Sequence, residues 1–157
     1  MTHLTLFDGT EREVHIVDEE IPFIDGCLIV SRTNKQGIIT HCNDAFVEMS
    51  GYIKDDLIGQ PHHILRHPDM PSSIFKSLWN TVSKGNKWHG HVKNLRKDGK
   101  YYWVHATAIA NIRHGEIIGF SSIRRKPSRD RINEAIKQYT LLKQEESQHV
   151  LCFNSQP

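Results

Sequence analysis

A proline-punctuated segment in the middle of the chain sets the strongest limit on the fold. Residues 60–71 hold three histidines, an arginine and an aspartate among their prolines. Proline lacks a backbone N–H and restrains the residue before it to extended geometry, so this segment cannot continue as a long helix. It therefore divides the chain into two parts and holds polar side chains in a turn-rich stretch.

Before this segment the sequence predicts a hairpin followed by short helices. Residues 27–31 form a continuous apolar strand, residues 34–37 supply turn residues, and residues 38–42 form the return strand. Asn43 precedes a helical pattern and is a suitable N-cap, and Gly51 is suited to ending that helix.

After the segment the hydrophobic period changes from helical to strand-like. Residues 72–83 place their apolar side chains on one face of a helix. Residues 88–95 alternate between two faces, and Asp98-Gly99 predicts a tight hairpin into a long strand over residues 101–110. A last strand follows over residues 117–124.

These elements predict an α+β fold. Two strands, a helical crossover and a three-strand meander make a five-stranded antiparallel sheet with helices on one face and flanking terminal helices. Residues 1–21 read as a polar N-terminal flank that ends in a short helix or a packed strap. We expect the folded domain over residues 22–126 and a C-terminal amphipathic helix and tail over residues 127–157.

Composition excludes several classes of protein. The net charge of +2, from 20 basic and 18 acidic residues, argues against a nucleic-acid binder. The scattered cysteines fit neither a disulfide framework nor a zinc site and suit a reducing cytoplasm. No apolar run is long enough to span a bilayer. Catalytic motifs are absent from the sequence, so we do not expect an enzyme.

Arg66, His67 and Asp69 are the first candidate binding residues. A guanidinium group offers a planar fork that matches a phosphate or a ring carbonyl. The structural alternative is a well-capped loop, in which Asp69 accepts backbone donors and Arg66 is solvated. The residues alone leave both interpretations open.

Trp79, Trp88 and Asn94 form a second group. Large aromatic residues at regular spacing usually pack in a core, and Trp79 fits that role better than Trp88. Gly90, between Trp88 and Asn94 on one strand face, would let a flat ring approach the sheet. A buried asparagine with an unmet group costs about 1–3 kcal/mol. Asn94 is therefore either a ligand contact or the cap of the following hairpin.

Arg66-His67-Pro68-Asp69 and residues 93–103 together resemble the PAS sensor domain of bacterial aerotaxis receptors, which hold FAD non-covalently. The resemblance runs over roughly residues 27–125. It implies a sensor whose FAD follows oxygen or respiratory electron flow and which signals to a chemoreceptor or other partner protein. The cofactor-binding residues that we expect are Asn43, Arg66, His67, Asp69, Trp79, Trp88 and Asn94.

Two alternatives to FAD remain open. A histidine in this crossover ligates haem iron in other PAS sensors, and His62, His63 and His67 are available for that role. The other alternative is a cofactor-free PAS domain that acts in dimerisation or protein interaction. The photoreceptor version is not expected, because no cysteine lies between Cys42 and Cys152.

The flanks predict a homodimer. The helix over residues 128–143 carries an apolar stripe, and Val14 and Ile16 form an apolar pair near the other end of the chain. Both surfaces need to be covered by protein. We expect the C-terminal helix to be the output element, paired with a second copy or with a partner.

Overall fold

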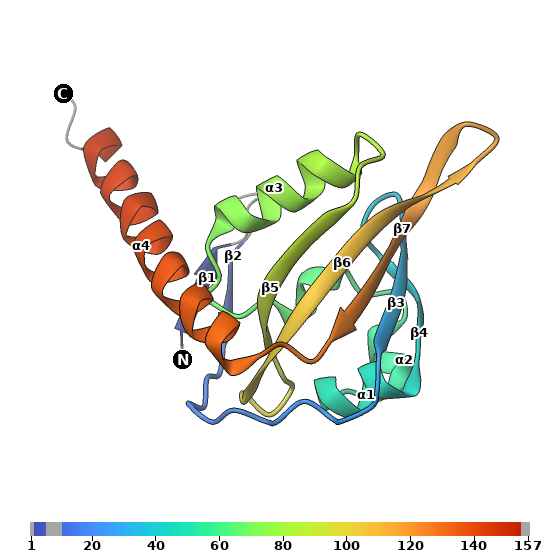
Figure 1. Ribbon diagram of the computed structural model, residues 1–157. Coiled ribbons are helices and arrows are strands. Elements are labelled where there is room, and N and C mark those ends of the chain that lie inside the picture. Colours follow the sequence, from blue (N-terminus) through green and yellow to red (C-terminus); the bar gives the residue numbers. More distant parts are fainter. Residues whose placement is uncertain (1, 6–10, 155–157) are drawn as a thin grey trace.

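A five-stranded antiparallel sheet forms the centre of the protein, with strand order β4-β3-β7-β6-β5 (Figure 1). The computed structural model describes the backbone of residues 2–5 and 11–154. The predicted α+β fold and five-stranded sheet are confirmed. The strands are β3 (Ile29–Asn34), β4 (Ile39–Cys42), β5 (Trp88–Leu95), β6 (Tyr101–Arg113) and β7 (Glu116–Arg125).

The crossover from β4 to β5 covers one face of the sheet with short helical elements (Figure 1). The prolines account for its fragmentation, because a 3₁₀ helix follows Pro61 and a longer helix follows Pro71. The elements are α1 (Asp44–Ser50), α2 (Lys54–Leu57), the 3₁₀ helix η1 (His62–Leu65) and α3 (Ser72–Val82).

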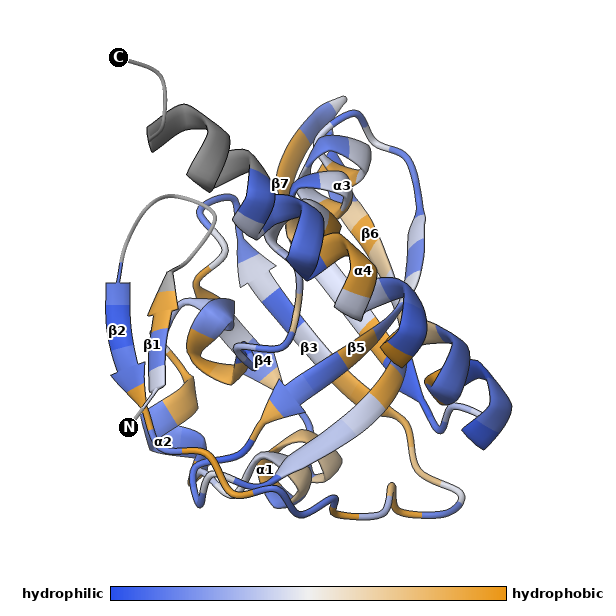
Figure 2. Cartoon of the chain, turned by 90° about the vertical axis from the view of Figure 1, so that its left-hand side faces the viewer, coloured by the Kyte–Doolittle hydropathy of each residue, from blue (hydrophilic) through white to orange (hydrophobic). Residues whose placement is uncertain are grey.

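The C-terminal helix α4 (Arg129–Asn154) lies against the opposite face of the sheet (Figure 2). Ile132, Ala135 and Tyr139 of its apolar stripe are buried. The Tyr139 ring stacks on Trp103 of β6 with the ring centroids 6.2 Å apart. The protein's own sheet therefore covers part of the stripe that was expected to pair with a second copy or a partner, while Ile136 of the stripe stays 44% exposed. The homodimer stays a prediction.

The N-terminal flank is a β-hairpin, so the expected short helix in this region is wrong. Strand β1 (Thr2–Thr5) pairs antiparallel with β2 (Glu11–Val14). Leu4 and Val14 pack against Leu95, at the end of β5, in a small apolar cluster of their own. The hairpin thus buries its apolar side chains against the domain.

A strap connects this hairpin to the sheet. The Val17 N–H donates to Gly99 O at 2.9 Å, and the Ile21 N–H donates to Tyr101 O at 2.8 Å. The sequence predicts either a short helix or a packed strap at the end of this flank, and these backbone hydrogen bonds confirm the packed strap. Within the described part of the chain, no helix has the length and apolar character needed to cross a bilayer.

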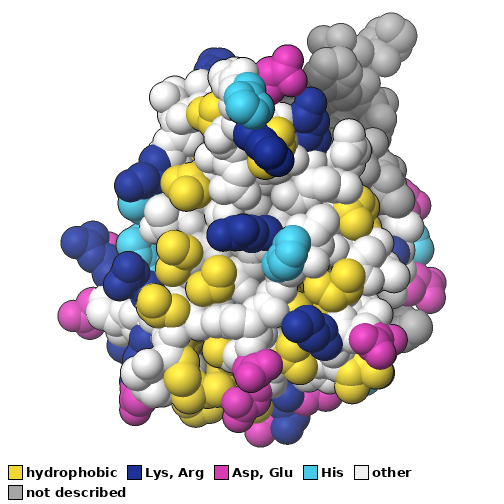
Figure 3. All heavy atoms as spheres, turned by 90° about the vertical axis from the view of Figure 1, so that its right-hand side faces the viewer, with side chains coloured by type: hydrophobic (Ala, Val, Ile, Leu, Met, Phe, Trp, Pro, Cys, Tyr) yellow, Lys and Arg dark blue, Asp and Glu magenta, His cyan; other side chains and the backbone are white. Residues whose placement is uncertain are grey.

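The face that carries the β6–β7 tip, β3 and β4 is mixed in character. Figure 3 shows basic, acidic and hydrophobic side chains interspersed over it. A nucleic-acid interface normally shows a continuous basic patch. The visible surface on this side has no such patch among the described residues.

Candidate functional site

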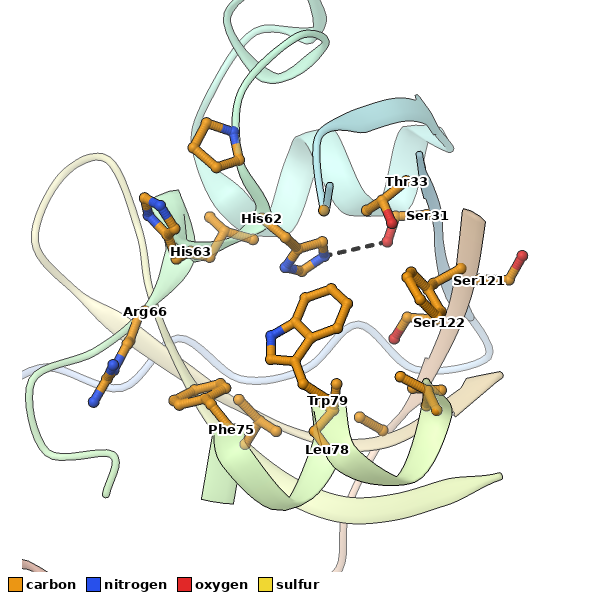
Figure 4. A pocket seen from close by; sticks show the side chains of 18 of the residues that line it. Ser31, Thr33, His62, His63, Arg66, Phe75, Leu78, Trp79, Ser121 and Ser122 are labelled. Carbon is orange, nitrogen blue, oxygen red and sulfur yellow. Dashed lines mark hydrogen bonds between the residues drawn. The ribbon is translucent and has the colours of Figure 1, made fainter. Parts of the chain in front are cut away.

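A cavity of about 240 Å³ lies between the inner face of the sheet and the crossover (Figure 4). Alternation along β5 and β6 turns small or apolar side chains toward it, and α3 contributes aromatic ones. Most of the lining is therefore apolar, with a few polar groups among it. The apolar lining includes Leu65, Phe75, Leu78, Trp79, Val82, Val92, Ala106, Ala108 and Phe120.

Trp79 supplies a flat wall of the cavity. Its indole projects toward the cavity beneath His62 in Figure 4 and meets Phe120 edge-on at 5.2 Å. Gly37 lies against the indole and has a φ of +80°, and a Cβ on it would come within 3.3 Å of the ring. The spacing of Trp79 favoured a plain core role, but the structure places it at the cavity.

Arg66 is a buried residue and not a solvated loop side chain. Only 4% of it is exposed. Its Nη2 donates to Ser72 Oγ at 2.9 Å and to Met70 O at 3.3 Å, and its guanidinium lies 4.8 Å from the centroid of the Phe75 ring. Arg66 is therefore a fixed part of the cavity wall, and its removal also affects the fold.

Asn94 lines the cavity from the sheet side and is 4% exposed. The hydroxyl of Tyr102 is close enough to interact with its side chain, but Asn94 Nδ2 makes no hydrogen bond of ordinary geometry with the described residues. Asp98, whose Oδ1 accepts from the Lys100 N–H at 3.1 Å, stabilises the following hairpin instead. The interpretation of Asn94 as the hairpin cap is therefore wrong.

Arg124 of β7 brings a buried positive charge to the cavity. Its Nη2 donates to Ser31 Oγ at 2.8 Å and to His62 Nε2 at 2.6 Å. Burial lowers the pKa of Arg124 to about 10, so it stays charged at neutral pH. Burial and the Arg124 charge lower the pKa of His62 to about 3, so His62 is a neutral acceptor.

Arg124 was not among the residues expected from sequence. One arginine near the end of a strand normally extends into water. The available signal was its alternation with Phe120 and Ser122, which places it on the inner face of β7. Its burial also depends on His62, a distant residue in sequence.

The remaining expected residues do not line the cavity. Asn43 is used locally: its Oδ1 accepts from the Val30 and Phe46 N–H groups, and its Nδ2 donates to Leu28 O at 2.8 Å. The Trp88 indole lies over Gly90, so it takes the space that a flat ligand ring was expected to use.

His67 and Asp69 lie beside the cavity wall. His67 is buried, and its Nδ1 accepts from the Asp69 N–H at 3.0 Å. Burial lowers the pKa of His67 to about 4, so it is neutral at physiological pH. Asp69 is exposed and pairs with Lys93 at 2.8 Å. These two residues order the loop that follows Arg66.

Two of the three histidines that the haem alternative names are poorly placed to ligate iron in the cavity, whereas His63 lines it. The Nε2 atom of His62 already accepts from Arg124. His67 lies outside the cavity lining. The described residues contain no cluster of three or more metal-ligating side chains.

Comparison with known proteins gives the family. A model of the PAS fold matches residues 39–124. The aerotaxis receptor of Escherichia coli (strain K12) is 44% identical over 118 residues, which is 75% of this chain and 23% of the receptor. The nitrogen fixation regulatory protein of Klebsiella pneumoniae is 31% identical over 75 residues, 48% of this chain and 15% of that protein. This chain thus spans less than a quarter of the length of these relatives.

Solved structures share the fold. The blue-light photoreceptor domain Aureochrome1 LOV superposes with a TM-score of 0.61 at 20% identity, over 76% of this chain and 91% of that one. A light-oxygen-voltage domain studied with a flavin analogue gives a TM-score of 0.59 at 20% identity, over 77% of this chain and 87% of that one. The family match, the aerotaxis-receptor match and the shared architecture lead to one conclusion: this chain belongs to the PAS family of sensor domains.

Proposed function

We propose that the cavity binds the isoalloxazine ring of FAD and that the domain senses redox or oxygen status. The observation that carries the proposal is the side-chain NH2 group of Asn94, which is buried at a largely apolar cavity and whose Nδ2 makes no hydrogen bond of ordinary geometry among the described residues. An unmet buried amide is costly, and a flavin edge, which has both donors and acceptors, satisfies it. The similarity to an aerotaxis receptor supports the same ligand.

The cavity is smaller than a typical small-molecule pocket. Pockets for small molecules usually measure roughly 300–1,000 Å³, and this one is about 240 Å³. In this proposal the cavity holds only the flavin ring, and the rest of FAD lies outside. Trp79 and Phe75 offer the flat walls that such a ring needs.

The residues around the cavity have distinct tasks in this proposal. Asn94 would orient the ring edge, and the aromatic walls would exclude water. A bound flavin supplies reversible electron uptake. The Arg124 guanidinium places a fixed positive charge at the cavity, which favours any added negative charge there. The neutral His62 holds this guanidinium in place.

The wider role that we propose is signal transduction of the aerotaxis kind. The output element would be α4, which packs on the sheet face opposite the cavity. A downstream receptor or signalling protein would read its position, and a cytoplasmic location fits such a partner. The domain has no proposed catalytic role.

The absorbance spectrum of the purified chain tests the proposal. We expect the bands of an oxidised flavin, with FAD identified by the mass of the chromophore released on unfolding. A Soret band would instead establish the haem alternative. A colourless protein that takes up no added FAD would leave the cofactor-free interaction domain as the function.

A further inference from the structure

The backbone of the crossover is bonded to charged side chains from both flanks of the chain. The crossover segment (residues 62–73) carries Arg66 in the cavity wall and runs from η1 to the first turn of α3. Arg12 reaches it from the N-terminal hairpin, and Lys143 and Glu146 reach it from α4. These contacts join parts of the chain that are far apart in sequence.

Arg12 closes the C-terminal end of η1. Its Nη2 donates to His63 O at 3.0 Å and to Ile64 O at 3.1 Å. His63 O also accepts from the Arg66 N–H at 3.0 Å, so Arg12 adds a second donor to it and supplies one to Ile64 O at the end of the helix. Arg12 thereby fixes the residues immediately before Arg66.

Glu146 closes the N-terminal end of α3. The residue that precedes this helix is Pro71, which provides no side-chain cap. The Glu146 carboxylate accepts from the Ser73 N–H at 3.0 Å and from the Ser72 N–H at 3.3 Å. A carboxylate at this position also complements the positive end of the helix dipole. Lys143, one turn earlier in α4, donates to Pro68 O at 2.9 Å.

A short bonded path connects Glu146 with the cavity. Ser72 donates its N–H to Glu146, and its Oγ accepts from Arg66 Nη2 at 2.9 Å. The side chain of the cavity residue Arg66 is therefore anchored on the residue that Glu146 holds. A shift of α4 along α3 would act on Arg66 through one serine.

We propose that Arg12 and Glu146 are positioning residues of the ligand site, which hold the crossover segment, and Arg66 with it, against the cavity. Docking of the two flanks and occupation of the cavity are then coupled, and each favours the other. For its ligand, this inference rests on the proposed flavin function. Its first consequence, that Arg12 and Glu146 stabilise the crossover segment, applies to the ligand-free protein as well.

Hydrogen exchange on the ligand-free protein tests that consequence. In Glu146→Gln, amides of residues 62–73 should exchange roughly 5- to 30-fold faster than in the wild type, while those of β6 and β7 keep their rates. Glu145→Gln is the matched control, because Glu145 is the exposed neighbour with the same charge. It should behave as the wild type.

A second pair of variants tests the N-terminal contact. Arg12→Met should accelerate exchange in the same segment by a similar factor. Arg12→Lys keeps a cationic donor and should restore most of the protection. Unchanged exchange at residues 62–73 in both Glu146→Gln and Arg12→Met would overturn the proposal. Equal acceleration over the whole sheet would also overturn it, because that marks general destabilisation.

Flavin release tests the coupling. In protein loaded with FAD, the dissociation rate should rise in Glu146→Gln and Arg12→Met and stay at the wild-type value in Glu145→Gln. Faster exchange with an unchanged dissociation rate would overturn the coupling. If the wild-type protein binds no FAD, the proposed function fails, and the exchange rates still decide whether these residues position the cavity wall.

Discussion

The two walls of the cavity are held in different ways. On the sheet side, Asn94 lies in β5, which pairs with β6 without interruption, and Arg124 lies in β7, which pairs with β3 without interruption. On the crossover side, Arg66 lies between short helices and has one isolated backbone bridge to the sheet. Side chains from the flanks, among them Arg12 and Glu146, fasten that wall. The sheet therefore supplies a fixed surface, and the crossover is the wall that can adjust at lower cost.

A larger side chain on the sheet wall should fill the cavity and abolish flavin binding while it changes the stability of the fold only slightly. Ala106→Met extends a side chain from β6 into the cavity, and we expect complete loss of flavin binding. Because the added atoms enter existing space, the free energy of unfolding should change by less than about 2 kcal/mol. Absorbance and chemical denaturation measure the two effects. Ala110→Met, on the same strand but outside the lining, should keep its flavin.

His62 joins the two walls, and its titration should be visible in stability. Its pKa is about 3 in the folded protein and about 6.5 in an unfolded chain. Between these values the unfolded chain binds the extra proton, so the free energy of unfolding falls as pH falls, by about 1.4 kcal/mol per pH unit. Above the unfolded pKa this slope vanishes. Urea denaturation of the wild type and of His62→Gln between about pH 7 and about pH 5 measures this slope. If the free energy of unfolding changes with pH equally in both proteins, the lowered pKa of His62 is contradicted.

Arg66→Ala should damage the adjustable wall. Losing the bonds to Ser72 and Met70 O should lower the free energy of unfolding by about 1.5–3 kcal/mol and release flavin. Arg32→Ala, at an exposed strand position, is the matched control and should keep both properties. A variant with wild-type stability would show that the burial of Arg66 does not contribute to the fold. Denaturation and absorbance on the same samples decide this.

The smallest effect is expected at Asn94. Asn94→Asp adds a negative charge near the ring and should lower the flavin reduction potential, because an anion disfavours electron uptake. At about 5 Å a partly screened unit charge is worth on the order of 1 kcal/mol. Spectroelectrochemical titration of both proteins measures the shift. An unchanged potential with full loading would mean that Asn94 does not contact the ring.

Local patterns were enough to predict the framework. Alternation in residues 88–95 and turn chemistry at Asp98-Gly99 predicted the β5–β6 hairpin, which the structure contains. Asn43 and Gly51 bound α1 as their residue types predict. These predictions are correct because each feature depends only on residues that are neighbours in sequence. The N-terminal hairpin was missed although Val14 and Ile16 alternate and Asp8-Gly9 is the same type of turn signal, because the segment is short and mostly polar.

The candidate site was less predictable because it depends on distant contacts. Alternation correctly places Asn94 at the cavity, but the same argument fails for Trp88, whose indole folds over Gly90. The burial of Arg66 depends on how the crossover packs, and that of Arg124 depends on His62. No local sequence pattern predicts these contacts. Side-chain packing, more than element type, decides which residues reach the cavity.

The pairing of β3 with β7 has a consequence for how the chain folds. Val30 is opposite Ile123, so one of the first strands of the sheet finds its partner only after nearly all the others exist. Such non-local pairings slow folding, whereas the β5–β6–β7 meander closes through short turns. We expect the meander to form early and the β3–β4 hairpin to join it late. During synthesis, the cavity would then be completed only when β7 has left the ribosome.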